Sequence, residues 1–450
     1  MKRLPLTKSP FELLSALIEL YDEIYLLESL EGSKKLARYS FIGFDPHLKL
    51  QFCDDEVHFE DEDGETTIKR IADPMTVLRE VLKGYFTPYS GLRFVGGAVG
   101  YVAYDAVRYW ETIPDLTRRD TMFPTIELAV YSDGIVFDHW NNVNYYYYSS
   151  DDRFDTVKAL FTGSSPMSPL SYSPPRVNIP KEVFEEQVRK AKSYIAAGDI
   201  LQVVLSKRYD FTVKGDLLAF YKALRRINPS PYMYFLKLGS RKIIGSSPEM
   251  LVRVEGDVVE TYPIAGTRPV TNDAARNDAL AAELLSDPKE RAEHTMLVDL
   301  ARNDLGKVST FGSVQVPEFM EVQQYSHVQH IVSRVTGRLS GGHDSFDALR
   351  AVFPAGTVSG APKVRAMEII EECEPTSRGP YAGAVGYFSN NGNADFAITI
   401  RTLIVDGQRA SIQVGAGIVA DSVPEREWFE TEDKIRALLR ALEFSEAHIE

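Results

Sequence analysis

The sequence predicts a mixed α/β (α+β) protein, because two kinds of hydrophobic pattern alternate along the chain. Short runs of apolar, aromatic and β-branched residues, typical of strands, occur at 23–29, 37–44, 47–52 and 56–61. A helical pattern fills 182–197 and closes on Gly198, a residue type that commonly ends helices. With 450 residues, 44% of them hydrophobic, the chain can form one large core or two domains.

The first third of the chain contains most of the short predicted strands. Ser9-Pro10 is a helix start signal ahead of an amphipathic stretch, and a second helix is expected over 74–85. Turn residues at 61–64 indicate a hairpin. The glycine-rich stretch 91–105 lacks the strand-to-helix context of a dinucleotide loop, so its glycines predict close backbone packing. Further strands are expected within 125–149.

A linker is predicted at 162–180, which is rich in Ser and Pro. We therefore divide the chain into an N-terminal region, 1–161, and a second region, 181–440. The second region is expected to contain strands and helices in mixed order, with helices at 216–227, about 275–305, 345–352 and 362–373. Its last strands are expected at 382–389, 395–407 and 409–421.

Composition excludes several classes of protein. A net charge of −14 argues against a nucleic-acid binder. Cys53 and Cys373 are too few, and too far apart, for a disulfide framework or a zinc site. Glu12 and Glu19 interrupt the first apolar segment, so it is not a signal peptide, and no run is long enough to span a membrane. We expect a cytoplasmic protein.

A helix start at Asp287-Pro288 introduces the first cluster of polar residues. Asp at the N-cap and Pro at the first helical position are typical of helix starts. Glu290, Glu293 and His294 then share one helix face, because positions three and four apart are neighbours. Taken alone, this face is more simply explained as a charged surface exposed to solvent.

A second pair with the same spacing favours a metal site. Glu427 and Glu430 stand three residues apart on another predicted helix, which follows Pro424. Two helices with two carboxylates each could enclose one divalent cation. Oxygen-only ligation suits magnesium, which usually keeps several waters and binds oxygens of the substrate.

An arginine in a late predicted strand suggests an anion site. Side chains of the strand predicted over 395–405 alternate between two faces, which places Arg401 in mid-strand on one face with small and apolar residues. An Arg in such a place usually pairs with an anion, either a protein carboxylate or a ligand. The next strand carries Gly415-Ala416-Gly417, which would let a ligand approach the backbone. Residues 353–363 form a turn that leads into a helix.

Several motifs together resemble the chorismate-using enzymes, and most closely the large component (component I) of anthranilate synthases. The resemblance covers essentially all of 181–440 and, more weakly, LLES at 26–29, ARYSFIG at 37–43 and GYxxYD at 100–105. The motifs that carry it are PIAGTRP at 263–269, LVDLARNDLG at 297–306, VQHIVSRV at 328–335, GTVSGAPKVRAMEII at 356–370, YAGAVGY at 381–387, IRT at 400–402 and the final ExxE.

The resemblance implies a fold and a set of roles. The fold is a large sandwich of two mainly antiparallel sheets with helices packed outside. The implied metal is Mg²⁺, with Glu293 and Glu430 as ligands and Glu290 and Glu427 holding its waters. The implied catalytic residues are His330, Glu249 and Thr357. The implied chorismate-binding residues are Gly266, Thr267, Tyr381, Arg401, Gly415, Ala416 and Gly417.

Two positions separate members of the family. Relatives that add water to chorismate carry a Lys base where this chain has Gln202, and Gln cannot activate water. Relatives that make 4-amino-4-deoxychorismate commonly carry a nucleophilic Lys where this chain has Ala265. Ammonia itself would then attack C2, giving anthranilate and pyruvate. A 4-amino-4-deoxychorismate synthase remains the alternative, and a regulatory relative without catalysis is a third hypothesis.

The resemblance also implies partners. The chain shows no Cys-centred amidotransferase motif, so ammonia would come from a separate glutamine amidotransferase subunit (component II) in a hetero-oligomer. In the family, a serine and a Pro-Tyr-Met segment hold the inhibitor tryptophan. These positions match Ser29, Pro231, Tyr232 and Met233, and we expect Glu28 and Ser29 to meet the ammonium group of tryptophan.

Overall fold

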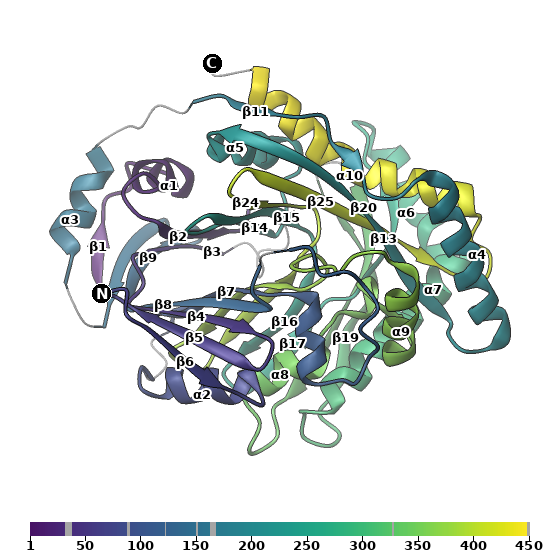
Figure 1. Cartoon of the computed structure of the whole chain (residues 1–450), viewed down its shortest axis with the longest axis horizontal. Coiled ribbons are helices and arrows are strands. Elements are labelled where there is room, and N and C mark those ends of the chain that lie inside the picture. The colour runs from purple at the N-terminus through teal and green to yellow at the C-terminus, as the bar shows by residue number, and fades with distance from the viewer. Residues whose placement is uncertain are drawn as a thin grey trace.

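The computed structural model describes residues 1–31, 38–87, 91–121, 123–149, 152–162, 168–325 and 328–447. Within these ranges, the chain forms two large sheets whose ladders are antiparallel, with helices on their outer faces (Figure 1). The predicted sandwich fold is therefore confirmed. No helix in these ranges is long and apolar enough to cross a membrane.

The first sheet runs across the whole molecule. Its strands, in spatial order, are β1 (Lys2–Leu4), β10 (Val143–Tyr148), β9 (Asp133–Asp138), β3 (Tyr39–Phe44), β2 (Glu23–Glu28), β14 (Tyr232–Leu238), β15 (Arg241–Ser247), β24 (Thr402–Asp406), β25 (Arg409–Ile418), β13 (Gln202–Gly215) and β11 (Leu170–Tyr172). Two short strands, β12 (Arg176–Val177) and β21 (Gly360–Ala361), also pair with β13.

The second sheet, like the first, contains strands from both the first third and the rest of the chain. Its strands, in spatial order, are β18 (Ile264–Pro269), β20 (Val328–Arg338), β17 (Val258–Thr261), β16 (Met250–Glu255), β23 (Ala394–Ile398), β22 (Ala384–Ser389), β7 (Gly97–Val102), β8 (Ile126–Tyr131), β4 (Leu48–Cys53), β5 (Glu56–Asp61) and β6 (Thr66–Arg70). β19 (Gln315–Gln324) pairs with β20. The hairpin predicted at 61–64 is the β5–β6 connection.

The helices are α1 (Pro10–Leu17), α2 (Pro74–Lys83), α3 (Phe154–Ala159), α4 (Lys181–Ala197), α5 (Leu217–Ile227), α6 (Ala274–Ser286), α7 (Pro288–Gly306), α8 (Ser345–Val352), α9 (Lys363–Cys373) and α10 (Pro424–Ala447). Short 3₁₀ turns occur at η1 (Tyr104–Tyr109), η2 (Leu160–Thr162) and η3 (Gly356–Val358).

Alternation along the strands divides the core into layers. In β2, Ile24 and Leu26 join a cluster with α1, α5 and α10, whereas Tyr25 joins a cluster that contains residues of both sheets. Side chains of a strand point to alternate faces, so this split places the second cluster between the sheets. A further cluster packs α2 and α8 on the outer face of the second sheet.

The boundary predicted at 162–180 does not separate two sheets. Each sheet contains strands from both 1–161 and 181–440. Residues 163–167 lie outside the described part of the chain, and 170–172 and 176–177 of the same segment form β11 and β12. The N-terminal strands are thus built into both layers, and they share hydrogen bonds with the strands that carry the site.

The helix start predicted at Asp287-Pro288 is confirmed. Asp287 ends α6 and caps α7, where its side chain accepts hydrogen bonds from the backbone N–H groups of Lys289 and Glu290, so the helical stretch expected over about 275–305 is two helices. One local prediction needs correction. The strand expected over 395–405 breaks into β23 and β24, and Arg401 lies between them with φ of 51°. The prediction that Arg401 lies in mid-strand was therefore wrong.

The glycine-rich stretch 91–105 behaves as predicted. Gly97 and Gly100 lie in β7, between β22 and β8. A Cβ atom on Gly100 would lie 2.0 Å from the carbonyl oxygen of Glu127, and one on Gly97 would lie 2.1 Å from that of Phe388. These glycines therefore permit close backbone packing rather than ligand binding.

Candidate active site

One cavity of about 220 Å³ brings together the predicted catalytic and substrate-binding residues, except Ala416 and Gly417. We call it the Arg401 cavity. It lies where β18 and β20 of the second sheet approach β25 and α10. The predicted residues in its lining are Glu249, Gly266, Thr267, His330, Thr357, Tyr381, Arg401 and Gly415.

Arg401 supplies the positive charge of this cavity. Its guanidinium forms no ion pair within the ranges that the structure describes, and Glu249 and Tyr325 are the titratable groups that would stabilise its charge when ionised. Burial lowers the pKa of Arg401, although the group stays charged. An arginine without a protein partner that lines a cavity is suited to binding an anionic ligand.

His330 is fixed in one tautomer by the strand beside it. Its Nδ1 lies 2.8 Å from the Gly266 carbonyl oxygen, which can only accept, so Nδ1–H is the donor and Nε2 is left unprotonated. Thr267 Oγ1 lies 3.1 Å from the same nitrogen. Burial lowers the pKa of His330 to about 4, so the ring is neutral at physiological pH.

Gly266 is required by its surroundings. The register shifts in β18 between Ala265 and Arg268, and Gly266 has φ of 64°, which favours glycine. A Cβ atom there would lie 2.9 Å from Glu290 Oε2 and 2.8 Å from Leu284 Cδ1. The bulge therefore brings the backbone beside His330 close to the first acidic helix.

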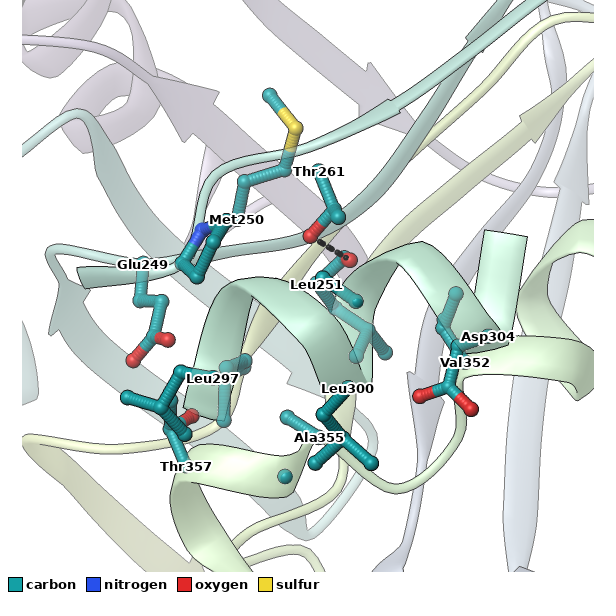
Figure 2. A pocket seen from close by; sticks show the side chains of 14 residues that line it. Glu249, Met250, Leu251, Thr261, Leu297, Leu300, Asp304, Val352, Ala355 and Thr357 are labelled. Carbon is teal, nitrogen blue, oxygen red and sulfur yellow. Dashed lines mark hydrogen bonds between the residues drawn. The ribbon is translucent and has the colours of Figure 1, made fainter. Parts of the chain in front are cut away.

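Glu249 is a buried acid. Burial raises its pKa to about 8, against the opposing effects of Thr357 and Arg401. The Thr357 hydroxyl is buried beside the Glu249 carboxyl and makes no other hydrogen bond among the described atoms. Figure 2 shows both side chains at one end of a smaller cavity of about 40 Å³, with Asp304 at the other end. Glu249 and Thr357 thus form a wall shared by two cavities and have hydrogen-bonding capacity to spare.

The glycines of β25 allow close approach at another wall. A Cβ atom on Gly415 would lie 2.7 Å from the Tyr381 hydroxyl, and one on Gly417 would lie 2.6 Å from Gln202 Nε2. The side chain of Ala416 is fully buried in the core on the other face of the strand. Gly415 and Tyr381 line the cavity, so only part of the predicted Gly-Ala-Gly segment faces it.

The four predicted metal carboxylates influence one another. Burial and the nearby charges of Glu290 and Glu430 raise the pKa of Glu293. Burial, opposed by Ser422, and the charge of Glu430 raise the pKa of Glu427. Two helices far apart in sequence, α7 and α10, thus concentrate negative charge in one place. His294 does not join them, because its Nε2 lies 2.6 Å from Ser333 Oγ, away from the carboxylates.

This set fits magnesium in its donor chemistry. Every donor is a carboxylate oxygen, and a divalent cation would relieve both the burial and the mutual repulsion that raise the pKa values of Glu293 and Glu427. Among the described residues, no three Asp, Glu, His or Cys side chains are grouped closely enough to hold a cation by themselves. Water and substrate oxygens would have to complete the coordination, as is usual for magnesium.

Basic residues neutralise two of these carboxylates within the chain. Arg268 pairs with Glu290 at 3.2 Å, and Lys434 pairs with Glu430 at 2.8 Å. Lys434 Nζ also donates to the Gly415 carbonyl at 2.9 Å and lines the cavity. Sequence reasoning missed Lys434, although its position four residues after Glu430 on one helix face was a usable signal. Gln413 was also missed.

The residues predicted to hold an inhibitor also meet in the structure. β2 and β14 are neighbours, and Ser29, Pro231, Tyr232 and Met233 line one cavity of about 50 Å³, which we call the Ser29 cavity. Glu28, expected to meet an ammonium group, instead forms an ion pair with Arg225 at 2.7 Å. Its carboxylate is therefore already neutralised.

Comparison with known proteins identifies the class of this site. A family model described as chorismate binding enzyme matches residues 22–440. The chain therefore belongs to the chorismate-binding enzyme family. It is 50% identical over 438 residues to the anthranilate synthase component 1 of Methanothermobacter marburgensis, covering 97% of this chain and 94% of that protein.

Two more similar proteins carry the same name. The anthranilate synthase component 1 of Bacillus subtilis is 41% identical over 456 residues, covering 94% of this chain and 88% of that protein. The crystal structure of anthranilate synthase component I from Streptococcus pneumoniae TIGR4 superposes with a TM-score of 0.79 at 39% identity. That match covers 91% of this chain and 93% of the solved one.

Proposed function

We propose that the chain converts chorismate and ammonia into anthranilate, pyruvate and water with the help of Mg²⁺, as the large component of an anthranilate synthase. This reaction is the first committed step of tryptophan biosynthesis. The observation that carries the proposal is the Arg401 cavity, where an arginine with no ion-pair partner in the described part of the chain lies with a buried acid, and an acidic helix pair lies nearby.

The substrate is a dianion, and the site offers one device for each carboxylate. Arg401, with Tyr381 and the backbone at Gly415, would bind the enolpyruvyl carboxylate by charge-assisted hydrogen bonds. Glu293 and Glu430 would hold Mg²⁺, and Glu290 and Glu427 would hold its waters. The bound ion would neutralise and orient the carboxylate on the ring.

Proton transfer can be assigned to the two buried titratable groups. Ammonia forms a bond to C2 while the C4 hydroxyl leaves, and Glu249 donates the proton that turns this hydroxyl into water. A carboxyl with a pKa of about 8 is still largely protonated at neutral pH and can act as this acid. Loss of the C2 proton and of the enolpyruvyl group as pyruvate then gives the aromatic ring. The unprotonated Nε2 of His330 is a suitable proton acceptor.

Two side chains favour ammonia as the nucleophile. Ala265 lines the cavity and carries no amine, which disfavours the alternative, a 4-amino-4-deoxychorismate synthase with a nucleophilic Lys. Gln202 is buried and cannot act as a base toward water. We further propose that a separate amidotransferase component supplies the ammonia, because the relatives named component 1 imply a second component.

We also propose that tryptophan inhibits the enzyme through the Ser29 cavity. Its support is that strands from both parts of the chain line this cavity, and that none of the described residues lines both this cavity and the Arg401 cavity. Since the cavity measures only about 50 Å³, an indole would have to widen it. An effector that favours the wider arrangement can shift the equilibrium between two states of the enzyme.

The proposal is tested by incubating the purified chain with chorismate, MgCl₂ and an ammonium salt at alkaline pH. Anthranilate, identified by fluorescence and mass, is the expected product. Isochorismate or 4-amino-4-deoxychorismate as the product would place the chain with other members of the family. Binding of chorismate without turnover would favour a regulatory relative.

A further inference from the structure

A second, larger cavity shares a turn, residues 377–381, with the Arg401 cavity. It has a volume of about 450 Å³, roughly twice that of the Arg401 cavity, and we call it the Asp105 cavity. Ser377 and Gly379 line the Asp105 cavity, whereas Tyr381 lines the Arg401 cavity. One short turn therefore contributes residues to the walls of both.

Two polar groups in this cavity have unused bonding capacity. Asp105 accepts a hydrogen bond from the Gly379 N–H at 2.8 Å and has no Lys or Arg within ion-pair distance among the described residues. Ser377 is only 4% exposed, and its hydroxyl has no hydrogen-bond partner there. Unmet buried polar groups are costly, which makes them candidates for binding a ligand.

The charge left unmatched in the cavity is negative. Arg108 is engaged by Glu371 at 2.7 Å, and Arg119 by Asp54 at 2.6 Å and Asp115 at 3.1 Å. Burial, opposed by the Gly379 hydrogen bond and by Arg108 and Arg119, raises the pKa of Asp105 to about 6, and Glu371 adds to this rise. The carboxylate is still ionised at neutral pH, so the cavity selects a cation rather than an anion.

The remaining walls are mixed. Tyr109, Phe123, Ile71 and Pro124 form an apolar part, and Asp55, Thr121 and Thr125 add polar groups. Aromatic rings accept both an apolar body and a neighbouring cation. We propose that the Asp105 cavity binds a primary ammonium ligand with an aromatic or alkyl body, whose ammonium group donates to Asp105 and Ser377.

Such a ligand would act on chorismate binding through the shared turn. The Gly379 carbonyl accepts from the Tyr104 N–H at 2.8 Å, and the fully buried Arg378 bonds the carbonyls of Val358 and Val204. A ligand on Asp105 competes for the carboxylate that holds the Gly379 N–H. Binding here is therefore expected to change the affinity for chorismate, and chorismate to change the affinity for the ligand by the same factor.

A cysteine in the cavity wall allows a site-specific test that does not depend on the proposed activity. Cys53 lines the cavity and is partly exposed, whereas Cys373, the other cysteine of the chain, is buried. The rate of Cys53 alkylation by N-ethylmaleimide is measured by peptide mass, with and without millimolar phenylethylamine. The amine is expected to slow alkylation, and its neutral isostere phenylethanol is not.

Variants make the test decisive. Asp105→Asn should weaken phenylethylamine binding, measured by calorimetry and by Cys53 protection, by about tenfold or more, because a charge-assisted hydrogen bond is lost. Asp63→Asn, an exposed carboxylate of the β5–β6 connection that does not line the cavity, serves as the control. If Asp105→Asn unfolds, Ser377→Ala must show weaker protection. Equal protection by phenylethanol, unchanged binding in a folded Asp105→Asn chain, or no protection at all would overturn the proposal.

Discussion

The Nδ1–H of His330 donates to the carbonyl of Gly266 at 2.8 Å, and this contact joins the imidazole to the first acidic helix. On the same residue, a Cβ atom would lie 2.9 Å from Glu290 Oε2. A change at Gly266 should therefore disturb both the proposed proton acceptor and the proposed metal site.

Gly266→Ala is expected to lower kcat/KM by at least tenfold and to raise the Mg²⁺ concentration needed for half-maximal activity. A non-glycine residue at this φ also costs about 1–2 kcal/mol of stability. Gly256→Ala is a matched control, because Gly256 has φ of 63° but no neighbour within 4 Å. The control should lose similar stability and keep its activity. Equal kinetics for the two variants would show that the contact with Glu290 has no role.

Glu293→Gln and Glu430→Gln are each expected to weaken Mg²⁺ binding and to remove most of the activity. Each change takes one charge from a carboxylate set that binds a hard cation. Mg²⁺ titrations of activity, together with Mn²⁺ binding followed by electron paramagnetic resonance, provide the measurement. Glu443→Gln, an exposed position on the same helix as Glu430, is the control. Wild-type Mn²⁺ affinity in either test variant would refute the ligand assignment.

Arg401→Ala is expected to raise the KM for chorismate by about one to two decades, since a hydrogen bond to a charged group contributes about 1.5–3 kcal/mol. Arg409→Ala, an exposed arginine on β25, should leave KM unchanged. Steady-state kinetics on both variants measure the effect. If Arg401→Ala kept the wild-type KM, Arg401 would be a structural residue of the break between β23 and β24.

Glu249→Gln is expected to lower the activity and, at alkaline pH, to raise the stability of the folded protein. Loss of the acid should reduce kcat by about 10²–10⁴. Because the folded-state pKa of Glu249 is raised to about 8, the folded protein binds this proton more tightly than the unfolded chain does. Glu249 therefore lowers stability as pH rises from its unfolded pKa through about 8. The Gln variant should have a higher Tm than wild type at about pH 9 and a similar Tm at about pH 4. A lower Tm at alkaline pH would contradict the buried-acid assignment.

Ser29→Arg is expected to abolish inhibition by tryptophan while the KM for chorismate stays almost unchanged. The added side chain would fill a cavity of about 50 Å³. Met233→Thr should do the same, but Met233 is 1% exposed in the core, so this variant also loses stability. Inhibition curves at fixed chorismate are the measurement. An unmodified chain that ignores millimolar tryptophan would end the regulatory proposal and leave the catalytic one intact.

Local sequence signals predicted much of this fold correctly. Asp287, Pro288 and the acidic face of α7 follow rules that act within one helical turn, and alternation in β2 follows from strand geometry. The mixing of N-terminal and C-terminal strands within each sheet depends on contacts far apart in sequence. The composition of the segment 162–180 is a local property and carries no information on which strands pair across it.

In the candidate site, too, local motifs were informative, whereas backbone state and tertiary contacts were not predictable. Glu249, His330, Thr357 and Arg401, which the motifs singled out, line one cavity in the structure. Alternation failed at Arg401 because φ there is 51°, a backbone state that the pattern of polar and apolar residues does not encode. Glu28 was expected to be available, but Arg225 reaches it from α5, which is a tertiary contact.

The central claim is that ammonia attacks C2 of chorismate in the Arg401 cavity. The most direct measurement supplies the purified chain with chorismate, MgCl₂ and isotopically heavy ammonium, and follows the products by mass spectrometry. We expect anthranilate that carries the heavy nitrogen, an equal amount of pyruvate, and no product when glutamine replaces ammonium. Heavy nitrogen in 4-amino-4-deoxychorismate without pyruvate release, or turnover of glutamine by the isolated chain, would contradict the account.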